Sequence, residues 1–207
     1  MSDPTGTIAG MSVNGWARPL RGLPELRKVL SLILDLVDPA GFDYRLVGTG
    51  AALAQGVQLP TGDIDILVAR RSDVDRFAAA LAGFRCLEAP AWLPRARQYF
   101  THFEVEEIDA GASTVEVPAE TDTVECIGRG PWEHYVEVEM GRHVVPVVRL
   151  ELRLVSELVR DRPDRSGPIT EHLRHHGADL QLLRRSMSDR GIDPARQAKV
   201  LDQLQRP

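Results

Sequence analysis

Two short segments of the chain combine residue types that suit phosphate and metal chemistry. Gly48, Thr49 and Gly50 follow a short apolar run, and the triplet Asp63-Ile64-Asp65 begins thirteen residues after Gly50. Side chains at positions i and i+2 of a strand share one face, and two neighbouring carboxylates repel unless a cation lies between them. Glycine also lets the backbone come close to a phosphate. The two segments therefore indicate metal-assisted phosphoryl chemistry on a nucleotide.

The apolar spacing of the chain predicts the elements that must position these residues. Strands are expected over 44–47 and 64–68, with a short helix over 51–55 between them. Further helices are expected over 23–37, 72–82, 150–159, 169–187 and 193–204, and further strands over 99–108, 113–117, 135–139 and 143–148. A turn is expected at Asp109-Ala110-Gly111, between two of these strands.

This order of elements predicts an α/β (α+β) fold in three parts. Residues 1–20 are rich in Gly, Ser, Pro and Thr and are expected to be loosely ordered. Residues 21–148 are expected to form the α/β core, and residues 149–207 a helical C-terminal region.

The composition is that of an ordinary globular protein. Apolar residues make up 43% of the 207 residues, and no stretch approaches the roughly 18–20 apolar residues that cross a bilayer. The net charge of −5 argues against a large DNA or RNA footprint, which usually carries a basic excess. The start of the chain lacks a basic segment followed by an apolar one, and Cys86 and Cys126 are interpreted as free thiols. A cytoplasmic protein with no membrane partner is therefore expected.

The pattern Gly-Thr-Gly-Ala, followed by Thr61-Gly62-Asp63-Ile64-Asp65, resembles the nucleotidyltransferase fold superfamily, the group related to DNA polymerase beta. The signature of that group is a Gly-Gly or Gly-Ser pair that opens a helix, then two acids in an acid–apolar–acid triplet. Gly48-Thr49 takes the place of the pair here. The likeness covers residues 44–70 and, more weakly, the chain to about 165, and it is closest to small stand-alone bacterial members. It implies a mixed β-sheet flanked by helices, with a helical C-terminal tail.

The resemblance also implies a third acid on a later strand and a basic residue near the nucleotide phosphates. Glu116, in Val115-Glu116-Val117, is the preferred candidate for the third acid, and Glu104 is the alternative. Arg165 is the expected phosphate contact. An arginine is expected there because Lys28 and Lys199 are the lysines of the chain, and arginine supplies the other positive charges.

The mechanism implied by the resemblance moves a nucleoside monophosphate from a nucleoside triphosphate (NTP) to a hydroxyl group. Gly48, Thr49 and Gly50 would bind the triphosphate. Asp63 and Asp65 would hold two Mg²⁺ ions, with Glu116 on the ion beside the acceptor hydroxyl. The acceptor is a small molecule, a protein or an RNA end, and the acidic net charge favours a small molecule over a long nucleic acid.

A second interpretation remains open. The chain could be a non-catalytic nucleotide-binding or regulatory module, for example one half of a toxin–antitoxin-like pair. A homodimer or a partner protein is compatible with either interpretation. The two are distinguished by whether nucleotide binding leads to transfer.

Overall fold

A seven-stranded mixed sheet forms the centre of the fold. The computed structural model describes residues 21–117 and 121–206, so the segment 1–20 that was expected to be loosely ordered lies outside the described residues. Along the chain, the strands are β1 (Tyr44–Val47), β2 (Asp63–Val68), β3 (Arg85–Leu93), β4 (Gln98–Val105), β5 (Ile108–Ser113), β6 (Tyr135–Met140) and β7 (His143–Val148). Their spatial order in the sheet is β3-β4-β5-β2-β1-β7-β6. The strand β2 pairs antiparallel with β1 and parallel with β5. The expected α/β fold class is confirmed.

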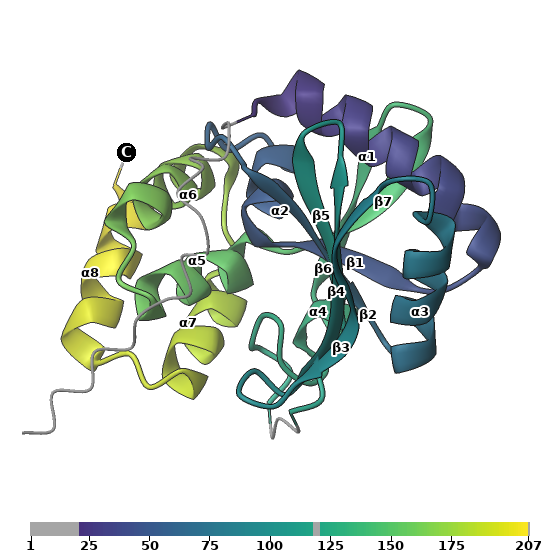
Figure 1. Cartoon of the computed structure of the whole chain (residues 1–207). Helices are drawn as coiled ribbons and strands as arrows, with labels where there is room; N and C mark the ends of the chain where they lie inside the picture. Colours follow the sequence, from purple (N-terminus) through teal and green to yellow (C-terminus); the bar gives the residue numbers. More distant parts are fainter. Residues whose placement is uncertain (1–20, 118–120, 207) are drawn as a thin grey trace, which may run out of the picture.

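Helices lie on both sides of this sheet (Figure 1). They are α1 (Leu23–Val37), α2 (Gly48–Ala54), α3 (Arg71–Ala80), α4 (Gly130–Glu133), α5 (Leu150–Val159), α6 (Pro163–His176), α7 (Leu180–Asp189) and α8 (Pro194–Gln205), with a 3-10 turn η1 (Asp38–Ala40) after α1. The helices α1 and α3 lie on one side, and the group α5–α8 lies on the other. Among the described residues, no helix is long and apolar enough to span a membrane.

The two faces of β2 have different roles. Ile64 and Ile66 are buried in one apolar core with residues of α1 and α3, including Leu30 and Phe77. Asp63 and Asp65 alternate with these isoleucines and therefore lie on the opposite face. That face looks towards α5, because Arg153 of this helix and Arg160, which directly follows it, act electrostatically on Asp65.

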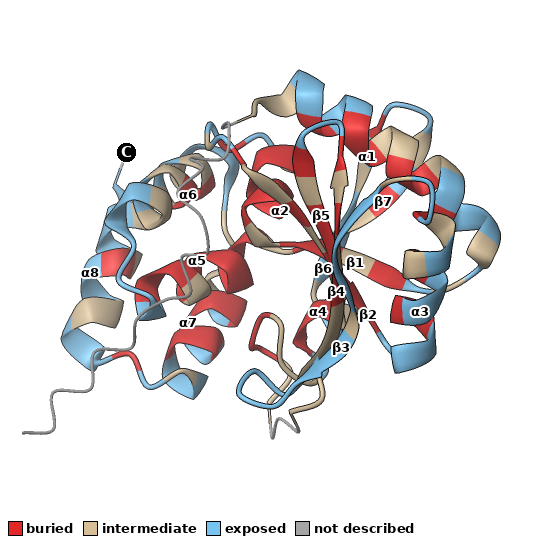
Figure 2. Cartoon of the chain, in the orientation of Figure 1, coloured by how far each residue is buried: buried red, intermediate tan, exposed pale blue. Residues whose placement is uncertain are grey.

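A second apolar core joins the C-terminal helices to α2 (Figure 2). Its members include Leu154, Ile169 and Leu183, and Ala52 of α2 is fully buried among them. Ala51, the preceding residue of α2, is buried in the first core instead. The small side chains of this helix let it lie between the two cores, and this fixes the glycine turn from which it starts.

The turn between β4 and β5 differs from the sequence prediction. It lies at Glu106 and Glu107, which have φ angles of 51° and 63°, and the segment expected to be a turn, Asp109-Ala110-Gly111, is part of β5. Two-residue hairpin turns with positive φ are usually signalled by Asn-Gly or Asp-Gly, so a Glu-Glu pair gives no such signal. Salt bridges hold the turn, from Lys28 to Glu106 at 2.8 Å and from Arg21 to Glu107 at 2.9 Å.

Other element predictions also differ from the structure. The strand expected over 113–117 is absent, because β5 ends at Ser113 and residues 114–117 form no strand. The single helix expected over 169–187 is two helices, α6 and α7, which are separated at Gly177 with a φ of 90°. The strand β3 was missed because almost all of its residues are exposed, so its sequence lacks the alternation of a half-buried strand.

Candidate functional site

The glycine turn at the end of β1 lies directly against Asp65. Gly48 has a φ of 69°, and a Cβ atom there would lie 2.3 Å from Oδ2 of Asp65. Both the backbone conformation and the close approach therefore require glycine at this position. Gly50 is less constrained, because a Cβ atom there would lie 3.6 Å from the carbonyl oxygen of Asp63. Thr49, between them, is 6% exposed.

Asp63 and Asp65 share one face of β2, as the sequence predicts. Thr61 donates a hydrogen bond of 2.8 Å from its hydroxyl to the carbonyl oxygen of Asp63, which fixes the start of the strand. Burial raises the pKa of Asp65 to about 7, and the negative charge of Asp63 adds to this effect. The ionised form of Asp65 is therefore costly unless a cation is near.

A third acid, Asp109 of β5, lies next to Asp63. In the parallel pairing of β2 with β5, Asp63 is opposite Asp109 and Asp65 is opposite Gly111. Residues in register on neighbouring strands point to the same face. Glu104 of β4 is opposite Asp109, so it belongs to the same row. Asp63, Asp109 and Glu104 thus lie side by side on three adjacent strands.

The structure does not bring Glu116 to this row. Its carboxylate accepts hydrogen bonds from Arg71, at 2.8 Å from Nε and 2.6 Å from Nη2, and this contact lowers the pKa of Glu116. Glu116 alternates with Ala112 and Thr114 and so lies on the face that α3 covers. Glu116 also lies beyond the end of β5 at Ser113, where its backbone N–H donates to the carbonyl oxygen of Arg97, whereas Asp109 is at the start of that strand.

Sequence reasoning missed Asp109 although a signal was present. Ile108-Asp109-Ala110 has the same apolar–acid–apolar pattern that selected Glu116. The same three residues, Asp109-Ala110-Gly111, also have the composition of a turn, and this competing prediction excludes Asp109 from a strand. The acid that fits the predicted position, on a strand next to Asp63 and Asp65, is Asp109.

Arginines from the helical side act on Asp63 and Asp65. Arg160, which follows α5, acts on Asp65, and Arg165 of α6 acts on Asp63. Burial, followed by the charges of Arg162 and Arg153, lowers the pKa of Arg165, whereas Asp63 opposes this shift. Basic side chains on one wall and carboxylates on the other can bind an anion that is already coordinated to a metal, such as a triphosphate.

A buried ion-pair network supports this basic wall. Arg153 of α5 is 2% exposed, and its Nη1 atom lies 2.9 Å from the Glu125 carboxylate. The same guanidinium contacts Glu157, one helical turn later. Glu157 in turn lies 3.6 Å from Nη1 of Arg165. The network therefore connects the segment that contains Glu125 to both α5 and α6.

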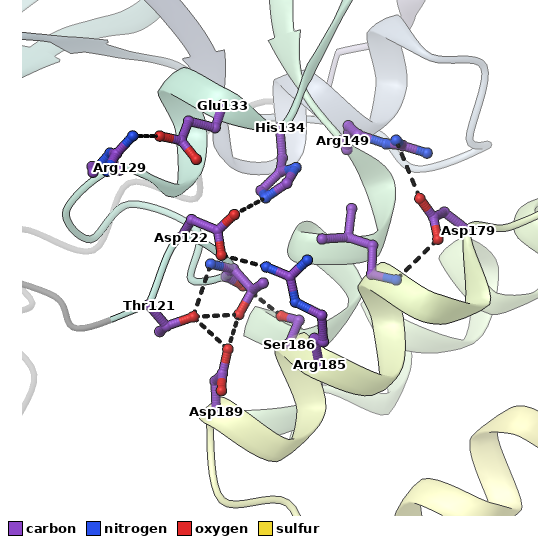
Figure 3. Close-up of polar contacts among 12 residues, drawn as sticks. Thr121, Asp122, Arg129, Glu133, His134, Arg149, Asp179, Arg185, Ser186 and Asp189 are labelled. Carbon is purple, nitrogen blue, oxygen red and sulfur yellow. Dashed lines mark hydrogen bonds and ion pairs between the residues drawn. The ribbon is translucent and has the colours of Figure 1, made fainter.

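The same segment is attached to α7 by polar contacts (Figure 3). Ser186 donates a 2.6 Å hydrogen bond to the carbonyl oxygen of Thr123. The carboxylate of Asp122 accepts from Arg185 and lies 2.9 Å from Nε2 of His134. Among the described residues, Asp122, Glu133 and His134 place potential metal ligands within 4.8 Å of one another.

The carboxylates of this group already contact cationic side chains. Each of the two carboxylates is paired with an arginine: Asp122 with Arg185, and Glu133 with Arg129 (Figure 3). The acids on the sheet fit a divalent cation better. They supply the carboxylate oxygens that Mg²⁺ prefers from adjacent strands, and burial together with the charge of Asp63 raises the pKa of Asp65.

Comparisons with known proteins agree with this architecture. No protein-family model and no curated protein sequence matches the chain. An inferred nucleotidyltransferase from Thermotoga maritima superposes with a TM-score of 0.54 at 16% identity, over 79% of this chain and 100% of that chain. An antigenic nucleotidyltransferase-like protein from Paracoccidioides brasiliensis superposes with a TM-score of 0.53 at 11% identity, over 89% of this chain and 95% of that chain. The chain is therefore a protein of the nucleotidyltransferase fold. This conclusion rests on the two superpositions, together with the strand–glycine turn–helix unit and the acids on adjacent strands.

Proposed function

We propose that this protein is a metal-dependent nucleotidyltransferase, which moves a nucleoside monophosphate from an NTP to a hydroxyl group of an acceptor. The observation that carries this proposal is the placement of Asp63, Asp65 and Asp109 on adjacent parallel strands, beside the turn at Gly48. Fold alone does not determine function, so the argument rests on these residues.

The three aspartates are the proposed ligands of two Mg²⁺ ions. These residues would hold Mg²⁺, which would neutralise the triphosphate and lower the pKa of an acceptor hydroxyl. The backbone at Gly48 and Thr49 binds the triphosphate on the side of β1. Arg160 and Arg165 contact its phosphates from the helical side, consistent with their interactions with Asp65 and Asp63.

The proposed acceptor is a small molecule, and a cationic one suits the acidic face of the sheet. The net charge of −5 supports this choice over a long nucleic acid. The proposed setting is a bacterial cytoplasm, and the NTP is the other substrate.

The test is transfer of label from each NTP, labelled at the α-phosphate, to small-molecule, protein and RNA fractions of a lysate in the presence of Mg²⁺. Asp65→Asn and Asp109→Asn are expected to lower transfer about a thousandfold, because each removes charge stabilisation from the transition state. Glu116→Gln is the matched control and is expected to retain transfer, since Glu116 lies with Arg71 on the other face. Nucleotide binding without transfer would overturn this proposal and indicate a regulatory nucleotide-binding module. Loss of transfer in Glu116→Gln but not in Asp109→Asn would restore Glu116 as the third acid.

A further inference from the structure

One row of residues crosses the sheet from its β3 edge to Asp65. Glu88 of β3 is opposite His102 of β4, His102 is opposite Gly111 of β5, and Gly111 is opposite Asp65 of β2. Residues opposite one another share a face, so these side chains lie on the face that carries the three aspartates. The other face is excluded for His102, because its neighbour Phe103 packs against Phe77 of α3.

The imidazole of His102 lies over Gly111. A Cβ atom at Gly111 would lie 2.3 Å from Cδ2 and 2.6 Å from Nε2 of His102. Any larger residue at 111 would therefore displace the ring. Because glycine has no side chain, nothing at this position separates the Nε2 edge of the imidazole from Asp65 in the next strand.

The other nitrogen of His102 faces a carboxylate. Nδ1 lies 3.5 Å from Oε2 of Glu88, and the ring of Phe100 packs edge-on against the imidazole with 5.4 Å between the ring centroids. A carboxylate next to Nδ1 favours the tautomer with its proton on Nδ1, which leaves Nε2 free to accept a proton. The His102 side chain is 38% exposed, so a substrate can reach it.

His102 lies on the side of the acids away from the proposed triphosphate site. Asp65 lies on β2. The turn at Gly48 contacts it from the neighbouring strand β1, whereas His102 belongs to β4, which lies two strands from β2 on the opposite side. A triphosphate bound at the turn leaves the β4 side for the acceptor. The row thus places an imidazole where the acceptor hydroxyl enters.

We propose that His102, oriented by Glu88, is the general base that accepts the proton of the acceptor hydroxyl; this inference rests on the proposed nucleotidyl transfer. The hydroxyl proton moves to Nε2 as the acceptor oxygen bonds to the α-phosphorus. The bond from that phosphorus to the bridging oxygen breaks, and pyrophosphate leaves with the electron pair. His102 then returns its proton to water.

The first test measures the position of His102 without any turnover. Mn²⁺ is added to the protein, and the imidazole signals of its histidines are followed by NMR, because a nearby paramagnetic ion broadens them. Signals of His102 are expected to broaden, whereas those of His176, at the C-terminal end of α6 and eleven residues after Arg165, serve as the reference. Broadening of His102 must disappear in Asp65→Asn. Unchanged His102 signals in a protein that binds Mn²⁺ through Asp65 would overturn the inference.

The second test is chemical rescue in the labelled-NTP transfer assay. His102→Ala is expected to lower kcat by about 100- to 10,000-fold, leave the KM for the NTP unchanged and regain activity with added imidazole. Gly111→Ala should reproduce the loss by displacing the ring, and the double variant should lose no more than either single variant. His175→Ala, on the exposed surface of α6, is the control and should match the wild type.

The outcomes separate this inference from the function on which it rests. Transfer by the wild type together with equal transfer by His102→Ala would overturn the role of His102 and leave the proposed function intact. A loss of kcat that imidazole does not restore would assign His102 a packing role and also overturn the inference. No transfer by a wild type that binds NTP would overturn the proposed function and, with it, the role of His102.

Discussion

Asp65 has the most constrained environment among the residues of the candidate site. Gly48 closes over its carboxylate on one side, and Asp63 lies next to it on the same strand. Its charged form is therefore opposed by both burial and repulsion, as its raised pKa of about 7 indicates. In the absence of metal, this residue should make the stability of the whole protein depend on pH.

The first prediction concerns that dependence. Because folding raises the pKa of Asp65 from its ordinary 3.8 to about 7, the folded protein binds more protons than the unfolded chain between these values. The free energy of unfolding should therefore fall as the pH rises from 4 to 7. Asp65→Asn removes this penalty and should be more stable than the wild type at pH 8, by on the order of 1 kcal/mol or more.

Urea unfolding in EDTA at pH 5 and pH 8 measures this effect. Asp202→Asn is the control, since Asp202 lies on the exposed surface of α8. An Asp65→Asn variant with the same pH dependence as the wild type would contradict the raised pKa. Addition of Mg²⁺ at pH 8 should stabilise the wild type and leave Asp65→Asn unaffected.

At the scale of elements, the segment before α4 is attached to the C-terminal helices by a buried charge network. Arg153 is shared by Glu125 and Glu157, and all three side chains are at most 3% exposed. Removing one member of such a network leaves a buried charge without its counter-ion. The exposed contacts of the same segment, such as Asp122 with Arg185, remain solvated and are worth far less.

The second prediction compares these two kinds of ion pair. Arg153→Met should lower the free energy of unfolding by about 3–5 kcal/mol, because Glu125 and Glu157 lose their partner. Arg185→Gln should cost less than about 1 kcal/mol. Urea denaturation at neutral pH measures both variants. Equal effects would show that the network around Arg153 is accessible to water.

Elements with strong periodic patterns could be predicted from the sequence, and those without such patterns could not. The helix Leu23–Val37 was predicted with both ends correct, because its apolar positions recur at helical spacing. The Glu106–Glu107 turn could not be predicted, since a Glu-Glu pair carries none of the residue signals of a turn with positive φ angles. The turn predicted at Asp109-Ala110-Gly111 excluded Asp109 from the candidates, and only the register of β5 with β2 shows that it lies beside Asp63.

At the scale of the whole molecule, the candidate site lies between the sheet and the C-terminal helices. The acids belong to β2 and β5, whereas Arg160 and Arg165 belong to the helical side. The proposed metal–nucleotide complex would contact both sides and stabilise their arrangement, because a ligand that binds the folded protein and not the unfolded chain favours folding.

The third prediction follows from this arrangement. Mg²⁺ with a non-hydrolysable NTP analogue should raise the melting temperature, with a gain of about 2.7 kcal/mol when the ligand is present at 100 times its Kd. Arg165→Gln and Asp109→Asn should each reduce the shift, although they lie on opposite walls. Thermal scans with Mg²⁺ alone, the analogue alone and both together separate the contributions. A full shift in both variants would place the nucleotide elsewhere.

The position of α2 between two cores affects how this fold can be shortened or recombined. A chain ended after residue 148 would expose Ala52 and Val57, which α5–α8 cover. Ala52 belongs to α2, and this helix begins at the turn at Gly48. Any replacement of the C-terminal helices, in evolution or in the laboratory, must therefore present a complementary surface to the small residues of α2, or it will disturb the turn that contacts Asp65.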